Sequence, residues 1–171
     1  MKNRVDAEGI LLEKKIDQAK TGTFIVTFTV DISNGTTKEN KLQVKTFRKV
    51  KEHADEVLAK APAVGTRVRV WGQLNTQHNA ERQTIYVSVM GGLNKAESTQ
   101  SYAAYDIEGV IKAFDAETNI VEIENDSSYT KGEEKVARTS TIQVYWADDA
   151  DFDASFIGKG ARLIGPAKGI K

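Results

Sequence analysis

The sequence predicts an all-β protein with one short helix, and three observations carry this prediction. Residues 23–32 alternate apolar and polar side chains with the period of two that a half-buried strand requires. In residues 50–61 the apolar positions recur every three or four residues, as on one face of a helix that ends near Pro62. The pair Asn34-Gly35 lies between two strand-like stretches and is a strong signal of an antiparallel hairpin.

Composition narrows the class of protein. The chain has 171 residues, enough for one domain or two small ones, and 40% of them are hydrophobic, as in ordinary globular proteins. No apolar run approaches the roughly 20 residues that span a bilayer, and the first residues, MKNRVDAEG, lack the apolar core of a secretion signal. We therefore expect a cytoplasmic protein without membrane contact. The absence of cysteine excludes disulfides, cysteine zinc sites and thiol catalysis.

The formal net charge of zero conceals two oppositely charged halves. Residues 1–97 contain 16 Lys and Arg against 11 Asp and Glu, a net charge of +5. Residues 98–171 contain 8 against 13, a net charge of −5. We expect the first half to attract polyanions and the second half to repel them.

Five strands and the helix are expected in the first half of the chain. The strands are predicted at residues 5–16, 23–32, 41–49, 65–76 and 83–90, with the helix between the third and the fourth. Phe24 and Phe28 share the aliphatic side of the second strand and are expected in the core. Gly72 marks a point where the fourth strand bends or another backbone approaches closely. A polar loop is expected over residues 77–82.

Three strands, a helix and two further strands form the element order of the OB-fold. This fold is a five-stranded Greek-key barrel that binds oligonucleotides across its second and third strands. Five short strands also build SH3-like barrels, but the position of the helix favours the OB-fold.

The polar sides of three strands carry cations and aromatic rings. We take these side chains as the predicted nucleic-acid-binding site: Lys41, Lys45, Phe47 and Lys49 on the third strand, Arg67, Arg69 and Trp71 on the fourth, and Tyr86 on the fifth. If the third and fourth strands are neighbours, their side chains form one groove that neutralises phosphates and stacks bases. The alternatives are a solvated outer face for the cations and, for Tyr86, a cover over one end of the barrel.

A resemblance to a known family supports this interpretation. The run ADEVLAKAPAVGTRVRVWGQLNTQ resembles the helix and fourth strand of bacterial and phage single-stranded DNA-binding proteins. The matching residues are Glu56, Leu58, Gly65, Val68, Val70, Gly72, Gln73, Leu74 and Thr76. The segment LQVKTFRK is similar to the third strand of the family, with Phe47 at the place of a base-stacking aromatic, and VSVMGG is similar to its last strand. The resemblance implies sequence-independent binding of single-stranded DNA in replication, recombination or repair.

The chain also departs from the family pattern at two places. Lys41 stands where the family usually has a base-stacking tryptophan. The loop after Thr76 reads QHNAERQ, without the basic residues and the second tryptophan that the family carries there. Fewer rings imply weaker stacking, by roughly 1–3 kcal/mol for each missing base contact. Trp71, at a position where the family has no ring, compensates in part.

The second half is predicted to be a degenerate or incomplete copy of the same barrel. Residues 105–111 (YDIEGVI) repeat residues 5–11 (VDAEGIL), and Gly160-Ala161-Arg162-Leu163 echoes Gly65-Thr66-Arg67-Val68. Strands are expected at residues 120–124 and 140–146. We therefore divide the chain into tandem OB-folds at residues 1–93 and 103–171, joined by a linker at residues 94–102. No residues remain for a fifth strand, so the copy is a four-strand variant, its edge is covered by the first barrel or another chain, or the sequence is truncated.

Other functional classes have little support in the sequence. His53 and His78 lack the ligand pattern of a metal site. Asp148, Asp149, Asp151 and Asp153 lack the central glycine and the terminal glutamate of a calcium loop. We expect no enzyme and no cofactor. The acidic second half is expected to serve assembly, such as a homodimer, or the binding of replication or recombination proteins. The alternative functions are a protein-interaction scaffold and a single-stranded RNA-binding protein.

Overall fold

The computed structural model describes residues 1–33, 40–79, 82–90, 92–98, 100–131, 133–145 and 152–166. The chain divides into two compact units. The N-terminal unit comprises Arg4–Tyr105 together with Gly165 and Pro166. The C-terminal unit comprises Asp106–Ile164 together with Met1–Asn3.

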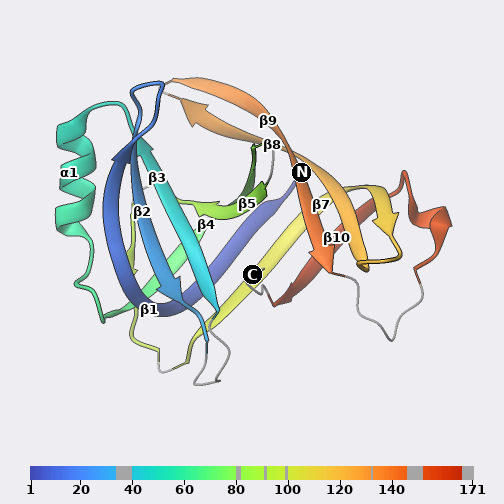
Figure 1. Ribbon diagram of the computed structural model, residues 1–171, viewed down its shortest axis with the longest axis horizontal. Helices are drawn as coiled ribbons and strands as arrows, with labels where there is room; N and C mark the ends of the chain where they lie inside the picture. Colours follow the sequence, from blue (N-terminus) through green and yellow to red (C-terminus); the bar gives the residue numbers. More distant parts are fainter. Residues whose placement is uncertain are drawn as a thin grey trace. The chain divides into compact units, whose positions relative to one another are not determined.

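Five strands of the N-terminal unit form a closed barrel (Figure 1). The elements are β1 (Asn3–Gln18), β2 (Phe24–Asp31), β3 (Lys41–Arg48), α1 (Lys51–Lys60), β4 (Arg67–Asn79) and β5 (Arg82–Ser88). Antiparallel pairs join β1 to β2, β2 to β3, β5 to β4 and β4 to β1, while β3 and β5 pair in parallel. This closed order, β1-β2-β3-β5-β4, confirms the OB-fold predicted from the sequence.

The inner faces of these strands are those that the alternation predicts. The side chains with no solvent exposure include Val26, Phe28 and Val30 of β2, Val44 of β3, Val68 and Val70 of β4, and Val87 of β5. Phe24 is half-buried and packs against this core. The placement of both phenylalanines in the core is therefore confirmed, and the polar faces of the strands point outwards.

The helix α1 packs against the barrel through its apolar face. Ala54 is fully buried, while Val57 and Leu58 are half-buried against the core. The Lys14 ammonium donates to the carbonyl oxygens of Leu58 and Ala61 at 3.3 and 3.5 Å. A cation at this position complements the negative end of the helix dipole. The helix spans one residue less at each end than the predicted residues 50–61.

Two glycines allow neighbouring strands to approach closely. A Cβ atom at Gly9 would overlap the carbonyl oxygen of Asp31 in β2, and one at Gly72 would overlap that of Ser88 in β5. Gly72 is also where β4 changes partners, since it pairs with β1 through Gly72 and with β5 from Gln73 onwards. The close approach predicted at Gly72 is thus confirmed.

Two connecting segments are more regular than the sequence suggests. The polar loop predicted over residues 77–82 is wrong, because β4 extends to Asn79 and pairs there with Arg82 of β5. The sequence of residues 77–82, QHNAER, is almost entirely polar and shows no alternation that would predict a strand. After Gly92, the short strand β6 (Asn94–Lys95) pairs with β4. The predicted turn at Asn34-Gly35 lies outside the described residues, although β2 and β3 are antiparallel as it requires.

The C-terminal unit is a smaller β structure. Its elements are β7 (Tyr102–Asp115), β8 (Ile120–Lys131), β9 (Glu134–Tyr145), the 3₁₀ turn η1 (Ala154–Phe156) and β10 (Gly160–Pro166). β8 pairs antiparallel with β7 and β9, and β10 pairs with β7. Ile111, Val121 and Ile123 form its core. Among the described residues, no strand takes the place that β5 has in the N-terminal unit.

The β8–β9 hairpin is longer than the predicted strands at residues 120–124 and 140–146. Its ladder continues to the pair of Lys131 and Glu134. These outer residues are mostly polar and show no regular alternation, which is why the sequence did not reveal the longer strands. Of the acidic string, Asp153 accepts a hydrogen bond from the Ser155 amide at 2.9 Å and caps η1. Trp146, Asp148, Asp149 and Asp151 lie outside the described residues.

Equivalent hydrogen bonds show that the two units are repeats of one structure. The alignment of β10 with β4 differs from the predicted one. The Gly65 amide donates to Leu11 in the N-terminal unit, and the Gly158 amide donates to Ile111 in the C-terminal unit, both at 2.7 Å. Both glycines have positive φ, +90° and +88°. The counterpart of Gly65 is therefore Gly158 and not Gly160, which moves Arg162 from the place of Arg67 to that of Arg69.

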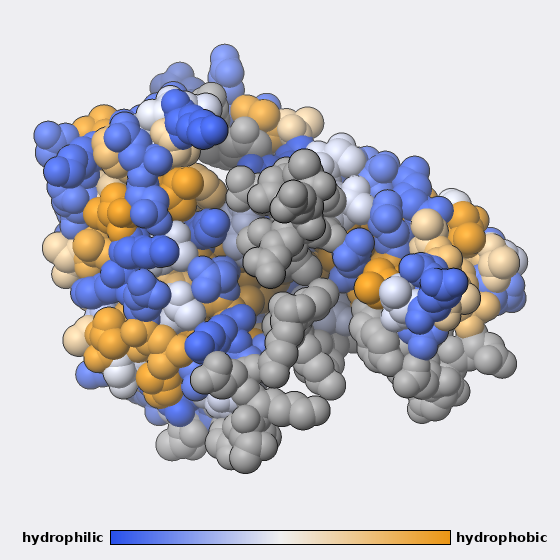
Figure 2. Space-filling view, in the orientation of Figure 1, coloured by the Kyte–Doolittle hydropathy of each residue, from blue (hydrophilic) through white to orange (hydrophobic). Residues whose placement is uncertain are grey.

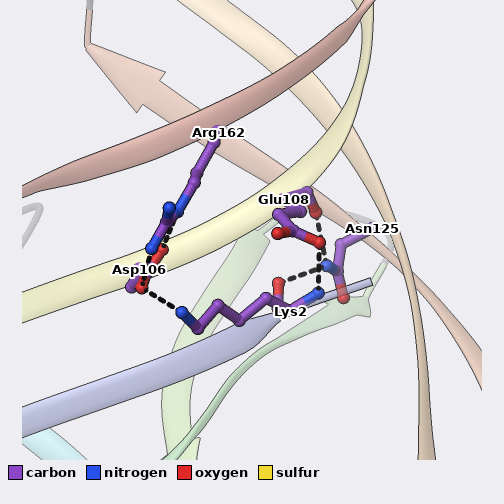
Figure 3. Close-up of polar contacts among 5 residues, drawn as sticks. All are labelled: Lys2, Asp106, Glu108, Asn125 and Arg162. Carbon is purple, nitrogen blue, oxygen red and sulfur yellow. Dashed lines mark hydrogen bonds and ion pairs between the residues drawn. The ribbon is translucent and has the colours of Figure 1, made fainter.

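An aspartate–arginine pair occurs at the same place in both units. Arg69 donates to both carboxylate oxygens of Asp6 at 3.3 and 3.2 Å. Arg162 does the same with Asp106 at 2.9 Å (Figure 3). The Lys2 ammonium lies 2.7 Å from Asp106, and the Lys2 carbonyl accepts from the Asn125 amide group at 3.0 Å. These contacts fix Met1–Asn3 in the C-terminal unit.

Candidate nucleic-acid interface

An aromatic pair with an adjacent cation lies on the outer face of β3 and β5. The rings of Phe47 and Tyr86 meet edge to face, with centroids 6.0 Å apart and planes at 62°. The Lys45 ammonium lies 5.1 Å from the centroid of the Tyr86 ring. Phe47 is 40% exposed, whereas Tyr86 is only 8% exposed. Tyr86 therefore supports the outer ring and ammonium, while Phe47 presents its surface to solvent. We name Lys45, Phe47 and Tyr86 the β3–β5 cluster.

Hydrogen-bonded polar side chains flank the β3–β5 cluster on the same face. Gln43 of β3 donates to the Thr29 hydroxyl of β2 at 3.1 Å. Asn75 of β4 donates to the Ser88 hydroxyl of β5 at 2.6 Å. Over the surface formed by α1 and strands β1 to β3, hydrophobic and hydrophilic residues are interspersed (Figure 2). A mixed surface of this kind suits a ligand that has both flat apolar groups and charges.

A second aromatic side chain, Trp71 on β4, is contacted by two arginines. The Arg4 guanidinium of β1 lies over the indole, 3.9 Å from its centroid, and the Arg69 guanidinium lies 5.5 Å away. Trp71 is 55% exposed. The ring is thus accessible, and its contacts with cations are of the cation–π kind.

Arg69 is committed to an ion pair. Besides its two hydrogen bonds with Arg69, Asp6 accepts one from the Tyr102 hydroxyl at 3.3 Å. The hydrogen bonds and charge of Asp6 raise the pKa of Arg69. Burial, followed by the charges of Asp6 and Glu8, raises the pKa of Tyr102. The positive charge of Arg69 is therefore neutralised by the Asp6 carboxylate.

Arg67 is likewise engaged, by the segment that follows β6. Its guanidinium donates to the buried Ser101 hydroxyl at 3.0 Å, and its carbonyl accepts from the Ala96 amide at 2.9 Å. The nearby β1 residue Glu8 is 7% exposed, and its Oε2 has no hydrogen-bond partner among the residues that the structure describes. The part of β4 that the sequence suggested as most cationic is thus compensated by acidic and polar partners.

The expected groove between adjacent strands does not form as predicted. The prediction made β3 and β4 neighbours, but β5 lies between them in the barrel. Closure of the OB barrel inserts the last strand at this point, because β5 pairs in parallel with β3. The structure therefore brings Lys45, Phe47 and Tyr86 together and places Trp71 in a separate cluster with Arg4 and Arg69. Lys41 and Lys49 are exposed at the two ends of the β3 segment.

The sequence interpretation missed Arg4, the residue closest to Trp71. The available signal was its parity, because Arg4 shares the outer side of β1 with Asp6 and Glu8. No group of three or more His, Asp or Glu side chains in the described part of the chain is placed to hold a metal ion. None of the helices that the structure describes is long and apolar enough to cross a membrane.

Two of the solved structures that resemble this chain in fold are forms of one protein. The wild-type single-stranded DNA-binding protein from Thermus aquaticus aligns with 96% of this chain and 84% of its own, at 13% identity and a TM-score of 0.59. The likeness is one of fold. A deletion mutant of that protein, delta 228-252 R190A, aligns with 96% of this chain and 85% of its own, at 13% identity and a TM-score of 0.51. No protein-family model and no curated protein matches the chain.

Proposed function

We propose that this protein binds single-stranded DNA without regard to sequence, on the outer face of the N-terminal barrel. The β3–β5 cluster is the observation that supports this most strongly. It combines an exposed ring, a second ring beneath it and an ammonium group at their side. Binding of single strands without sequence preference needs these parts, because every base has a flat face and every nucleotide a phosphate.

Each residue of the cluster has a distinct role in the proposed mechanism. Phe47 stacks on a base, while Tyr86 holds the Phe47 ring in place from below. Lys45 neutralises a phosphate, and Lys41 and Lys49 extend the positive charge along β3. Trp71 provides a second flat surface on β4. Because Arg69 is paired with Asp6 and Arg67 donates to the Ser101 hydroxyl, we assign the main phosphate contacts to the lysines of β3.

The biological setting of this activity forms the finer part of the proposal. The two solved structures compared above, which resemble this chain in fold, are both of the single-stranded DNA-binding protein from Thermus aquaticus. Together with the resemblance of residues 54–77 to the bacterial and phage family, this supports a role in replication, recombination or repair. The C-terminal unit, with its excess of acidic residues, is assigned to assembly or to binding partner proteins.

A salt titration with a dT oligonucleotide tests the proposed function. The logarithm of the binding constant should fall linearly with the logarithm of salt concentration, with a slope of about −0.7 for each neutralised phosphate. Lys45→Gln should reduce the slope by about that amount, whereas Lys20→Gln, in the exposed turn after β1, should not. A flat salt response, or equal binding of duplex DNA, would reject the proposal. An rU oligomer of the same length distinguishes DNA from RNA as the preferred strand.

A further inference from the structure

Three arginines lie on the outer face of β1 and β4, and two of them are already hydrogen-bonded to protein groups. Arg69 donates to both oxygens of Asp6, and Arg67 donates to Ser101. Arg4 is exposed and lies against Trp71. Within the described residues, its guanidinium makes no hydrogen bond or ion pair with a protein group. Arg4 is therefore the arginine of this face with donors to offer a ligand.

The contact with Trp71 holds the Arg4 guanidinium in a useful position. A guanidinium 3.9 Å from a ring centroid uses its flat face for the contact, while its N–H groups point outwards from its edge. That edge matches the geometry of a phosphate, to which arginine donates two parallel hydrogen bonds. The ring also restricts the side chain before the ligand arrives, which lowers the entropic cost of binding.

We propose that Arg4, held against Trp71, binds a phosphate of the single strand and that Arg67 and Arg69 do not. This inference rests on the proposed function and adds a second phosphate contact, on β1, to the lysines of β3. The ligand group is the phosphodiester that DNA and RNA share. On β1 the phosphodiester is bound by Arg4, a residue that was not among the site residues predicted from the sequence.

The neighbouring charges explain why Arg4 is preferred over Arg69. For Arg69 to bind a phosphate, it must leave Asp6, and the freed carboxylate would then lie close to the incoming negative charge. Repulsion between the Asp6 carboxylate and the phosphate therefore disfavours phosphate binding by Arg69. Arg4 has no such partner to release among the described residues. Arg4 can therefore bind a phosphate without breaking an existing ion pair.

Matched variants of the full chain test the inference by salt titration with a dT oligomer. Arg4→Gln should weaken binding about tenfold at low salt, as expected for one charge-assisted hydrogen-bonded contact, and should reduce the salt slope by about 0.7. The double variant Asp6→Asn/Arg69→Gln preserves the net charge and should leave the slope unchanged. Equal slopes for wild type and Arg4→Gln, or a reduced slope for the double variant, would overturn the inference.

A double-mutant cycle tests whether Trp71 positions Arg4. The effect of Arg4→Gln on affinity should be markedly smaller in a Trp71→Ala background, because the guanidinium is then no longer held. Additive effects would reject the positioning role of the ring. Circular dichroism melting of each variant checks that the exposed substitutions leave the fold intact. Failure of the proposed function is recognised separately, because the wild-type protein would then not bind the oligomer at all.

Discussion

Arg69 donates from Nε and Nη2 to the two carboxylate oxygens of Asp6, across β4 and β1. Asp6 thus neutralises the charge of Arg69 on the face to which we assign nucleic-acid binding. Both partners are partly exposed, with 45% and 28% of the side-chain surfaces accessible. An exposed pair of this kind contributes little to stability and is weakened by salt. Its main consequence is electrostatic, because it sets how much positive charge the face presents.

Asp6→Asn should therefore increase affinity for single strands. The substitution removes the negative charge and releases Arg69 to a phosphate, so the salt slope should become steeper by about 0.7. Titration of a dT oligomer at several salt concentrations measures both quantities. An affinity equal to that of the wild type would mean that Asp6 and Arg69 lie outside the ligand's path.

Phe47→Ala should weaken binding by roughly 1–3 kcal/mol, the usual cost of losing one base-stacking ring. The loss should appear at high salt as well as low salt, because stacking does not depend on released counter-ions. Val64→Ala is a matched control, since Val64 is another exposed apolar residue, 56% accessible, in the segment between α1 and β4. Equal affinities for the two variants would remove Phe47 from the interface.

Gly72→Ala should destabilise the N-terminal barrel, by about 1–3 kcal/mol as for other overpacked sites. The added Cβ would overlap the backbone carbonyl of Ser88, which cannot move without disturbing the β4–β5 ladder. Gly160→Ala is the control, because nothing lies within 4 Å of its Cβ position. Urea unfolding compares the two variants, and an unchanged midpoint for Gly72→Ala would contradict the close approach.

The C-terminal unit should lose stability at acid pH through Asp106. Hydrogen bonds from Arg162 and then from Lys2 hold the pKa of this carboxyl well below its usual range. A depressed folded-state pKa stabilises the fold above the unfolded value near 4, and this stabilisation is lost as pH falls below it. Asp106→Asn should therefore lower the melting temperature at pH 7, and the difference from wild type should shrink below about pH 4. A difference independent of pH would contradict this assignment.

A barrel fragment should be cut after Tyr105 and not within the predicted linker at residues 94–102. Ala103 is buried in the core of the N-terminal unit and Tyr105 packs against it, while Ser101 binds Arg67. A fragment of residues 1–105 should unfold cooperatively and bind single strands, whereas residues 1–97 should be less stable. Thermal melting followed by circular dichroism compares them, and equal stability would show that residues 98–105 are dispensable.

Periodicity predicted which side of each strand a residue occupies. Phe28 was assigned to the core and Phe47 to the surface because alternation along a strand reports burial directly. Periodicity carries no information about the strand alongside, which is why β3 and β4 were expected to be neighbours. The partner of Arg69 was hidden for the same reason, since Asp6 lies 63 positions away in the sequence. Only the closure of the barrel brings them together.

Spacing within the repeat was harder to predict than the repeat itself. The first strands were matched correctly, because residues 105–111 and 5–11 share a pattern around a buried glycine. The fourth strands were matched two residues out of register, since Gly158 and Gly160 both fit a short glycine pattern. The positive φ of Gly158 and its hydrogen bond to Ile111 select the correct one.

The corrected register has a consequence for how the two halves diverged. Val30 and Gly65 are 35 positions apart, and so are their counterparts Ile123 and Gly158. The same length of chain forms α1 in one copy and lengthens the β8–β9 hairpin in the other. After a gene duplication, point substitutions alone could convert one arrangement into the other between these positions, without insertion or deletion of codons.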